Sequence, residues 1–282
     1  MKVLVIGSSG QLGSEINDLK SEFPNLEFDL VDYPKVDITK SRHINDLFKN
    51  NKYDYCINCA AYTAVDQAEK DRAAANALNA QACLTLAKAC IPYKVTLIHI
   101  STDFVFNGED NIPLVETRLT DPVNYYGLTK LKGELSIQGA MENYFIFRTS
   151  WLYSSFGKNF VKTMINLSET KDELNIIVDQ LGSPTYARDL ARAILKLVDS
   201  KSTDYGLYHY SNEGVASWYD FTKAIFEYKG INTPVYPIPT EKYPTPAARP
   251  HYSVMDKSKF KKTFKIGIPH WRESLKECLT RL

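Results

Sequence analysis

The chain has 282 residues, enough for one large domain or two smaller ones with a sizeable core. Its 34 basic and 33 acidic side chains leave a net charge of +1, which carries no signature of nucleic acid binding. Hydrophobic residues make up 44% of the chain, and no apolar run approaches the ~18 residues of a membrane span. We therefore expect a cytoplasmic protein that binds neither nucleic acid nor a membrane.

Short apolar runs alternate with longer helical patterns through the first half. The pattern predicts strands at Lys2–Ile6, Leu26–Val31, Tyr55–Ala60, Thr96–Ser101 and Tyr144–Arg148, and helices at Gln11–Glu22, Ser41–Asn50, Asp66–Cys90 and Asn124–Gln138. This alternation is typical of an α/β fold of the Rossmann type, a doubly wound parallel sheet with helices on both faces. We expect residues 1–150 to form a dinucleotide-binding domain.

The pattern loosens in the second half, where we expect a smaller α/β substrate-binding domain over residues 151–282. Helices are predicted at Phe156–Leu167, Thr185–Leu197 and Trp218–Tyr228, and strands at Leu174–Val178 and Leu207–Tyr210. The helix near residues 185–200 is expected to return to the first domain. A Pro-rich segment, Pro234–Pro250, cannot form a central strand or a regular helix, so it is predicted to be an ordered loop layer over a site.

The cysteines and histidines give little sign of a metal or redox site. Five cysteines are scattered along the chain, and their odd number argues against a disulfide framework. Cys56 and Cys59 form a CxxC pattern, but they lie in an apolar run that is typical of a buried strand. We therefore favour core packing over metal binding for these two, and we expect no metal.

A glycine-rich turn follows the first predicted strand. Gly7, Gly10 and Gly13 have the spacing of a dinucleotide-binding turn, with Gln11 and Leu12 opening the next helix. Glycines let the backbone approach a pyrophosphate, and the helix N-terminus supplies amide donors. The sequence therefore predicts a cofactor site here, with a tight turn that binds nothing as the alternative.

Asp32 ends the second predicted strand, where a carboxylate can accept hydrogen bonds from the ribose hydroxyls of NAD(H). Lys35 lies close enough to accept the 2′-phosphate of NADP(H), so both NADH and NADPH remain candidates. Further cofactor contacts are expected from the residues that follow the second and third strands, namely Asp37, Ile38, Ala60, Ala61 and Tyr62.

Tyr126 and Lys130 are four residues apart in a predicted helix, so they share one face. The ammonium beside the phenol would favour the ionised phenol and lower its pKa. A phenol tuned in this way is suited to donate a proton to a carbonyl that receives a hydride. A YxxxK pattern is common by chance, but after a glycine-rich turn it predicts a reductase.

These motifs together resemble the extended short-chain dehydrogenases/reductases, and longer stretches resemble the dTDP-4-dehydrorhamnose reductases. The stretches are Cys59–Glu69, Ser101–Phe106, Arg148–Tyr153, Asn159–Phe160, Asp179–Thr185 and Tyr243–Pro250. The resemblance covers nearly the whole chain, including the substrate half that separates this branch from epimerases and dehydratases. It implies that the C4 keto group of dTDP-4-dehydro-6-deoxy-L-mannose is reduced to give dTDP-L-rhamnose, a step in polysaccharide biosynthesis.

The resemblance also implies roles for catalytic residues. Tyr126 would protonate the sugar C4 oxygen, Lys130 would hold the nicotinamide ribose, and Thr102 would hydrogen-bond the carbonyl. All three would contact the ligands, Thr102 and Tyr126 on the substrate side and Tyr126 and Lys130 on the cofactor side.

Val65, Phe104 and Trp151 would line the sugar pocket. Arg249 would bind the nucleotide pyrophosphate, because its fork suits phosphate oxygens. Phe104 and Trp151 could instead be core aromatics, and Arg249 could be a surface ion-pair residue. The family usually carries Tyr where Phe104 stands, which puts one polar contact in doubt.

A second departure concerns metal. Some members dimerise through a magnesium site built from acidic helix residues. Glu15 matches one such position, but Arg188 stands where a second carboxylate would be expected. We therefore predict that this metal bridge is absent and leave monomer and homodimer open.

Two alternative functions remain. One is a reductase for another nucleotide-linked 4-keto-6-deoxy sugar. The other is a non-catalytic NADP-binding regulatory subunit, which need not retain Thr102, Tyr126 and Lys130 together.

Overall fold

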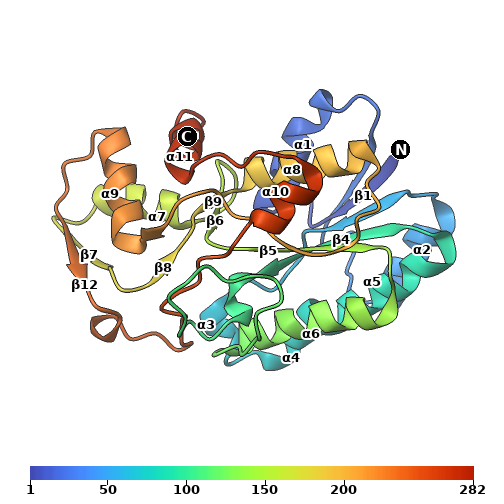
Figure 1. Ribbon diagram of the computed structural model, residues 1–282, viewed down its shortest axis with the longest axis horizontal. Helices are drawn as coiled ribbons and strands as arrows, with labels where there is room; N and C mark the ends of the chain where they lie inside the picture. The colour runs from blue at the N-terminus through green and yellow to red at the C-terminus, as the bar shows by residue number, and fades with distance from the viewer.

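The computed structural model describes residues 1–282 and contains a six-stranded sheet with helices on both faces (Figure 1). All neighbouring strands run parallel, in the order β10-β5-β4-β3-β1-β2. The strands are β1 (Lys2–Ile6), β2 (Glu27–Val31), β3 (Tyr55–Asn58), β4 (Thr96–Thr102), β5 (Tyr144–Thr149) and β10 (Gly206–His209). The predicted Rossmann-type α/β fold is confirmed.

Each face of the sheet buries its own core, because successive side chains of a strand point to opposite faces. Val3 and Val5 of β1 belong to one core, and Leu4 and Ile6 to the other. The first core is covered by α1 (Gln11–Leu19), α8 (Ala187–Ser200) and α10 (Ser258–Phe264), and the second by α2 (Ser41–Asn50), α5 (Ala82–Cys90) and α6 (Tyr125–Ala140).

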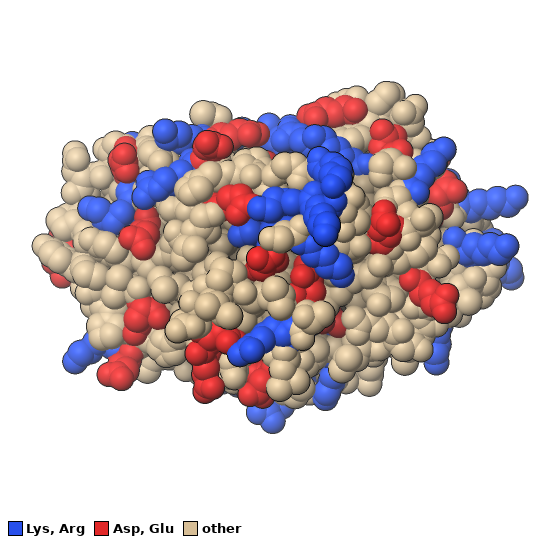
Figure 2. Space-filling view, in the orientation of Figure 1, with Lys and Arg blue, Asp and Glu red and all other residues tan.

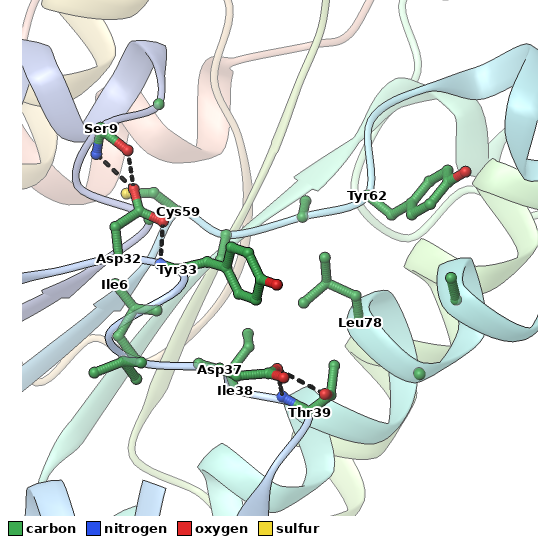
Figure 3. A pocket seen from close by; sticks show the side chains of 17 residues that line it. Ile6, Ser9, Asp32, Tyr33, Asp37, Ile38, Thr39, Cys59, Tyr62 and Leu78 are labelled. Atoms are coloured by element: carbon green, nitrogen blue, oxygen red, sulfur yellow. Dashed lines mark hydrogen bonds between the residues drawn. The ribbon is translucent and has the colours of Figure 1, made fainter. Parts of the chain in front are cut away.

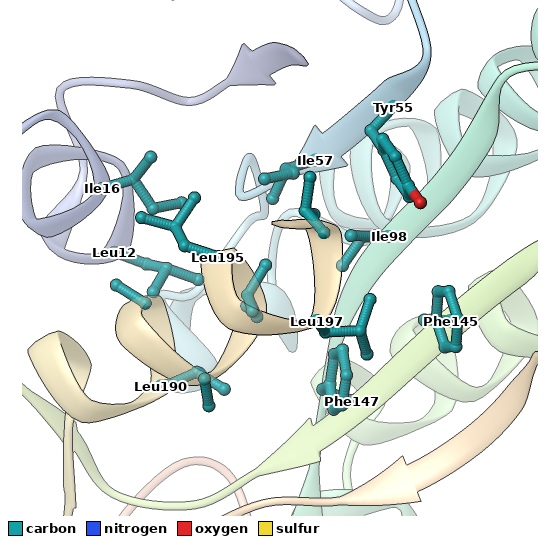
Figure 4. Close-up of a cluster of buried hydrophobic side chains, with 14 of the residues drawn as sticks. Leu12, Ile16, Tyr55, Ile57, Ile98, Phe145, Phe147, Leu190, Leu195 and Leu197 are labelled. Atoms are coloured by element: carbon teal, nitrogen blue, oxygen red, sulfur yellow. The ribbon is translucent and has the colours of Figure 1, made fainter. Parts of the chain in front are cut away.

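Helix α8 supplies much of the first core although it comes from the second half of the chain. Figure 4 shows Leu190, Leu195 and Leu197 packed among side chains of the sheet and of α1. Ten of the 22 buried residues of this core follow residue 150. The core on this face of the sheet is therefore completed only by segments from the second half of the chain.

A third core lies at the other end of the molecule, where Figure 1 shows a smaller group of helices and short strands. Its helices are α7 (Phe160–Ser168), α9 (Trp218–Lys229) and α11 (Trp271–Leu279). Its short strands pair two by two: β6 (Leu152–Tyr153) with β9 (Thr185–Tyr186), β7 (Leu174–Ile177) with β12 (Val235–Ile238), and β8 (Leu181–Gly182) with β11 (Ala216–Ser217).

Several predicted helix boundaries are wrong. The single helix expected over Asp66–Cys90 is broken into α3 (Val65–Ala68), α4 (Arg72–Asn76) and α5, with a π-helical turn at Ala77–Gln81. Asp71 starts α4, because its carboxylate caps the amide of Ala74. The helix expected from Phe156 begins at Phe160, after the cap Asn159. Helices α10 and α11 were not predicted.

The Pro-rich segment is ordered, as expected. It contributes β12, which pairs only with β7 and so leaves an edge where Pro237 costs no ladder hydrogen bond. Asn124, the cap of α6, donates from Nδ2 to the carbonyl of Ala248 at 2.8 Å. This bond ties the segment to the start of α6.

Charges are mixed on the face drawn in Figure 2, where a run of basic side chains lies over the region of α10. Near α10, Lys257 and Lys261 pair with Glu213 at 3.4 and 2.6 Å, which partly neutralises their charge. None of the helices combines the length and the hydropathy needed to cross a bilayer.

Candidate active site

The turn between β1 and α1 needs its glycines for close packing. Gly7 has φ +77°, and a Cβ there would lie 2.6 Å from the amide nitrogen of Ala60. A Cβ on Gly13 would collide with the carbonyl oxygen of Gly7. The turn therefore lies directly against the end of β3 and leaves its backbone free to approach a ligand.

A cavity of about 620 Å³ opens beside this turn (Figure 3). Eight of the residues predicted to bind cofactor line it: Gly7, Gly10, Asp32, Asp37, Ile38, Ala60, Ala61 and Tyr62. Gln11, Leu12, Gly13, Tyr126 and Lys130 do not. Leu12 is buried in the core, and Gln11 accepts a hydrogen bond from Asn159 at 3.1 Å. The cavity has the glycine turn at a β–α junction and the lining carboxylates that suit a dinucleotide.

Asp32 is already engaged with the turn. Its Oδ2 accepts hydrogen bonds from the amide of Ser9 at 2.7 Å and from the Ser9 hydroxyl, and its Oδ1 accepts from the amide of Tyr33 at 2.7 Å. A carboxylate offers about four acceptor sites, so Asp32 retains capacity for a ribose hydroxyl.

Sequence reasoning missed several residues of this cavity. Tyr33 is 74% exposed, and Figure 3 shows its ring projecting into the middle of the cavity. Ser9, Val36, Thr39, Cys59, Ala74, Ala77 and Leu78 also line it. Ser9 and Tyr33 are direct neighbours of the predicted Gly10 and Asp32, and this adjacency could have identified them. Ala74 lies in α4, which was not predicted as a separate helix.

Thr102, Tyr126 and Phe104 come together where β4 meets the N-terminus of α6. The rings of Phe104 and Tyr126 pack edge to face with centroids 5.8 Å apart. Gly127 permits this approach, because a Cβ there would collide with the carbonyl oxygen of Phe104. Asn124 caps the helix by accepting from the amide of Gly127 at 2.8 Å.

The phenol of Tyr126 is harder to ionise than expected. Burial raises the pKa of Tyr126 to about 12, and the nearby carboxylate of Asp103 adds to this, although the Thr102 hydroxyl acts in the opposite sense. Lys130 is not among the groups that shift it. The predicted lowering of the phenol pKa by Lys130 is therefore wrong for this arrangement, in which desolvation dominates.

Lys130 is buried and held from β4. Its Nζ donates to the carbonyl of Ile100 at 2.5 Å and lies 3.3 Å from Nε2 of His99. Burial lowers the pKa of Lys130, and burial followed by the Lys130 charge lowers the pKa of His99 well below its usual value. A neutral imidazole can accept a hydrogen bond from the lysine ammonium. His99 therefore helps to orient Lys130.

The hydroxyl of Thr102 has one proton, and Asp103 competes for it. Thr102 Oγ1 donates to Asp103 Oδ1 at 3.0 Å and accepts from the amide of Phe104 at 3.2 Å. Asp103 is 2% exposed, its Oδ2 has no partner, and burial raises its pKa to about 6. Thr102 can donate to a carbonyl only when its proton leaves Asp103.

Arg249 makes a bidentate ion pair with Asp66 of α3, at 3.1 and 2.8 Å. The hydrogen bonds from Arg249 lower the pKa of Asp66. Val65 begins α3, and Glu69 just beyond it accepts from the amide of Tyr125 at 2.7 Å. Helix α3 therefore bridges the Pro-rich segment and the start of α6.

Trp151 follows β5 with a φ of +49° and stacks on Trp218. Such a φ is rare for a bulky residue and indicates local strain.

Comparison with known proteins agrees with this geometry. A family model described as RmlD substrate binding domain matches residues 1–282. A dTDP-4-dehydrorhamnose reductase from Sinorhizobium fredii is 38% identical over 292 residues, covering 100% of this chain and 98% of that protein. The chain belongs to the RmlD substrate binding domain family.

Solved structures of similar proteins share the fold over their whole length. The structure of a dTDP-4-dehydrorhamnose reductase from Clostridium acetobutylicum has a TM-score of 0.95 at 42% identity, covering 99% of both chains. That of Bacillus anthracis, in complex with NADP, has a TM-score of 0.95 at 37% identity, covering 100% of this chain and 99% of that one. The resemblance stated from the sequence is confirmed.

This RmlD-family chain does not present a divalent-metal site at Glu15. The Arg188 guanidinium lies 3.2 Å from Glu15, contacts Asp18, and lies 3.6 Å from both Glu22 and Glu277. A fixed cation among these carboxylates does not suit Mg²⁺, so the residues at this position do not fit that ion.

Proposed function

We propose that this chain reduces the C4 carbonyl of dTDP-4-dehydro-6-deoxy-L-mannose to give dTDP-L-rhamnose, with NADH or NADPH as reductant. Two observations support the proposal. Tyr126, at the start of α6, lies beside Thr102 at the end of β4, and Lys130, one turn further along α6, donates to the carbonyl of Ile100 in β4. The chain is also 38% identical to a named dTDP-4-dehydrorhamnose reductase.

The dinucleotide supplies the hydride when bound, and the chain's residues supply position and a proton. The turn from Gly7 to Gly13 holds the pyrophosphate, and Asp32 accepts from the ribose. Lys130 orients the nicotinamide ribose. Tyr126 enters the reaction with its proton in place, because its raised pKa keeps the phenol neutral, and donates that proton to O4 of the sugar.

The substrate occupies the space between α6, Trp151 and the Pro-rich segment. Val65, Phe104 and Trp151 line the sugar site. Arg249 leaves its bidentate ion pair with Asp66 and binds two oxygens of the pyrophosphate in the same geometry. Residues 1–150 serve the cofactor and residues 151–282 mainly the substrate, with the helix near residues 185–200 returning to the sheet.

The proposal also extends to the setting of the enzyme. We infer a monomer or homodimer that acts in the cytoplasm on a nucleotide sugar, without nucleic acid or a membrane as partner. Light scattering on the purified chain tests the oligomeric state.

The decisive assay follows NAD(P)H oxidation with a panel of nucleotide-linked 4-keto-6-deoxy sugars. We expect turnover with the dTDP-linked L-sugar to exceed that with the others. Preference for a different sugar would favour a neighbouring reductase, and no turnover with any sugar or cofactor would favour a regulatory subunit. Lys130→Met is the control and should lower both turnover and cofactor affinity.

A further inference from the structure

A group of side chains beside Trp151 has no role in the function proposed above. It consists of Trp218 at the start of α9, Gln180, Gly182 in β8, and Thr240 in the Pro-rich segment. These residues come from three separate segments. Trp218 and Gly182 contact the indole ring of Trp151, and Gln180 and Thr240 continue from Trp218 through hydrogen bonds.

The ring of Trp151 is clamped. It stacks on Trp218 with centroids 3.6 Å apart and an interplanar angle of 8°. Gly182 approaches so closely that a Cβ there would lie 2.7 Å from Cε2 of Trp151. A bulky residue keeps a φ of +49° only where its surroundings over-determine the conformation. The stack and the glycine are those surroundings.

Trp218 is itself held by a directed chain of hydrogen bonds. Its Nε1 donates to Oε1 of Gln180 at 3.1 Å, and Nε2 of Gln180 donates to the Thr240 hydroxyl at 3.1 Å. That hydroxyl donates to Oδ1 of Asp179 at 2.7 Å. Gln180 is only 3% exposed, so its two bonds fix the orientation of the amide. The chain runs from the stacked indoles to the segment that carries Arg249.

We propose that Trp218 and Gln180 are positioning residues for the nucleotide sugar. They hold Trp151 in its strained conformation and link the wall of the sugar site to the Pro-rich segment through Thr240. The inference rests on the proposed function, in which Trp151 contacts the sugar and Arg249 the pyrophosphate. It adds that the residue that contacts the sugar and the segment that contacts the pyrophosphate are linked by the hydrogen bonds of Gln180 and Thr240.

The first test is spectroscopic. Two indoles stacked this closely couple their transitions, so we expect an exciton couplet in the far-ultraviolet circular dichroism of the full-length protein. Trp218→Phe should abolish the couplet, and Trp271→Phe, which removes an indole outside the stack, should retain it. A couplet that survives Trp218→Phe, or that the wild type lacks, overturns the stacked arrangement.

The second test is kinetic and uses Trp218→Phe and Gln180→Leu. Misplacing a group that orients substrate is costly, so KM for the nucleotide sugar should rise roughly tenfold while KM for the dinucleotide stays within about twofold. If Trp218 acts through Trp151, its effect should largely vanish in a Trp151→Phe background. An unchanged sugar KM, or full additivity, overturns the proposal.

Activity of the wild type and of the variants separates the proposed function from the positioning role. A wild-type enzyme that turns over no nucleotide sugar contradicts the proposed function and this inference with it. An active wild type whose Trp218 and Gln180 variants keep the sugar KM contradicts the positioning role alone.

Discussion

At the scale of single residues, burial governs the ionisable groups around β4 and α6. It keeps the phenol of Tyr126 protonated, withholds charge from His99, and leaves Asp103 with a pKa of about 6. An acid catalyst must hold its proton until the carbonyl needs it, so desolvation suits the role proposed for Tyr126.

Replacing Tyr126 by Phe removes the proton donor and keeps the ring against Phe104. We expect kcat to fall ~10²–10⁴-fold, the usual contribution of general acid catalysis. The free energy of unfolding should stay the same. Stopped-flow or steady-state oxidation of NAD(P)H measures it. Tyr125→Phe is the matched control, since that ring faces Arg72 instead. Near-normal turnover of the Tyr126 variant would exclude it as the acid.

Asp103→Asn should change how stability depends on pH. The Asp103 pKa of about 6 in the folded protein lies above the 3.8 of an ordinary aspartate. The stability that protonated Asp103 contributes is therefore fully present below the unfolded pKa and is lost as pH rises through the folded one. The amide avoids this loss and still accepts from Thr102. We expect the variant to gain up to about 3 kcal/mol at about pH 8, and little at about pH 3.5.

Urea unfolding at the two pH values checks this expectation. Equal stability differences at both would mean that Asp103 ionises freely in the folded protein.

At the scale of elements, the sequence predicted the sheet well because buried parallel strands are continuous apolar runs bounded by turns. Tyr126 and Lys130 were placed correctly because helical spacing is local. The partners of Lys130 were not predictable, since His99 and Ile100 reach it from β4, some thirty residues away in the chain. The helix break at Asp71 was missed because alanines on both sides favour helix.

Gly127 lets α6 lie against the turn that follows β4. Gly127→Ala forces a Cβ against the carbonyl of Phe104, so we expect a loss of about 1–3 kcal/mol and a sharp fall in turnover as Tyr126 is displaced. Gly139→Ala in the same helix meets nothing within 4 Å and should stabilise by up to about 1 kcal/mol. Thermal unfolding and activity of both variants decide it; similar behaviour would refute the close approach.

At the scale of the whole molecule, Arg188 joins three helices from distant parts of the chain. It pairs with fully buried Glu15 and with Asp18 of α1, and approaches Glu277 of α11. Asp18 also accepts from Arg281 at 2.8 Å, which brings the end of the chain back to its first helix.

Arg188→Met leaves the Glu15 carboxylate buried without its cation. Breaking such a pair typically costs ~3–5 kcal/mol, so the denaturant midpoint should fall clearly. Arg42→Met removes an exposed contact with Asp46 at 3.8 Å, and should change stability by less than about 1 kcal/mol. Comparable losses of stability in the two variants would contradict the expectation that the buried ion pair matters more than the exposed one.

The late completion of the first core sets an order of events during synthesis. When residues 1–150 have left the ribosome, α1 alone covers this face of the sheet and β5 lacks its neighbour β10, so the cofactor half cannot yet be stable. The nascent chain should therefore expose apolar surface, and bind chaperones, until α10, which ends at Phe264, has emerged. A fragment of residues 1–150 should bind hydrophobic dye and unfold without cooperativity, which means that cofactor binding can begin only after most of the substrate half has been made.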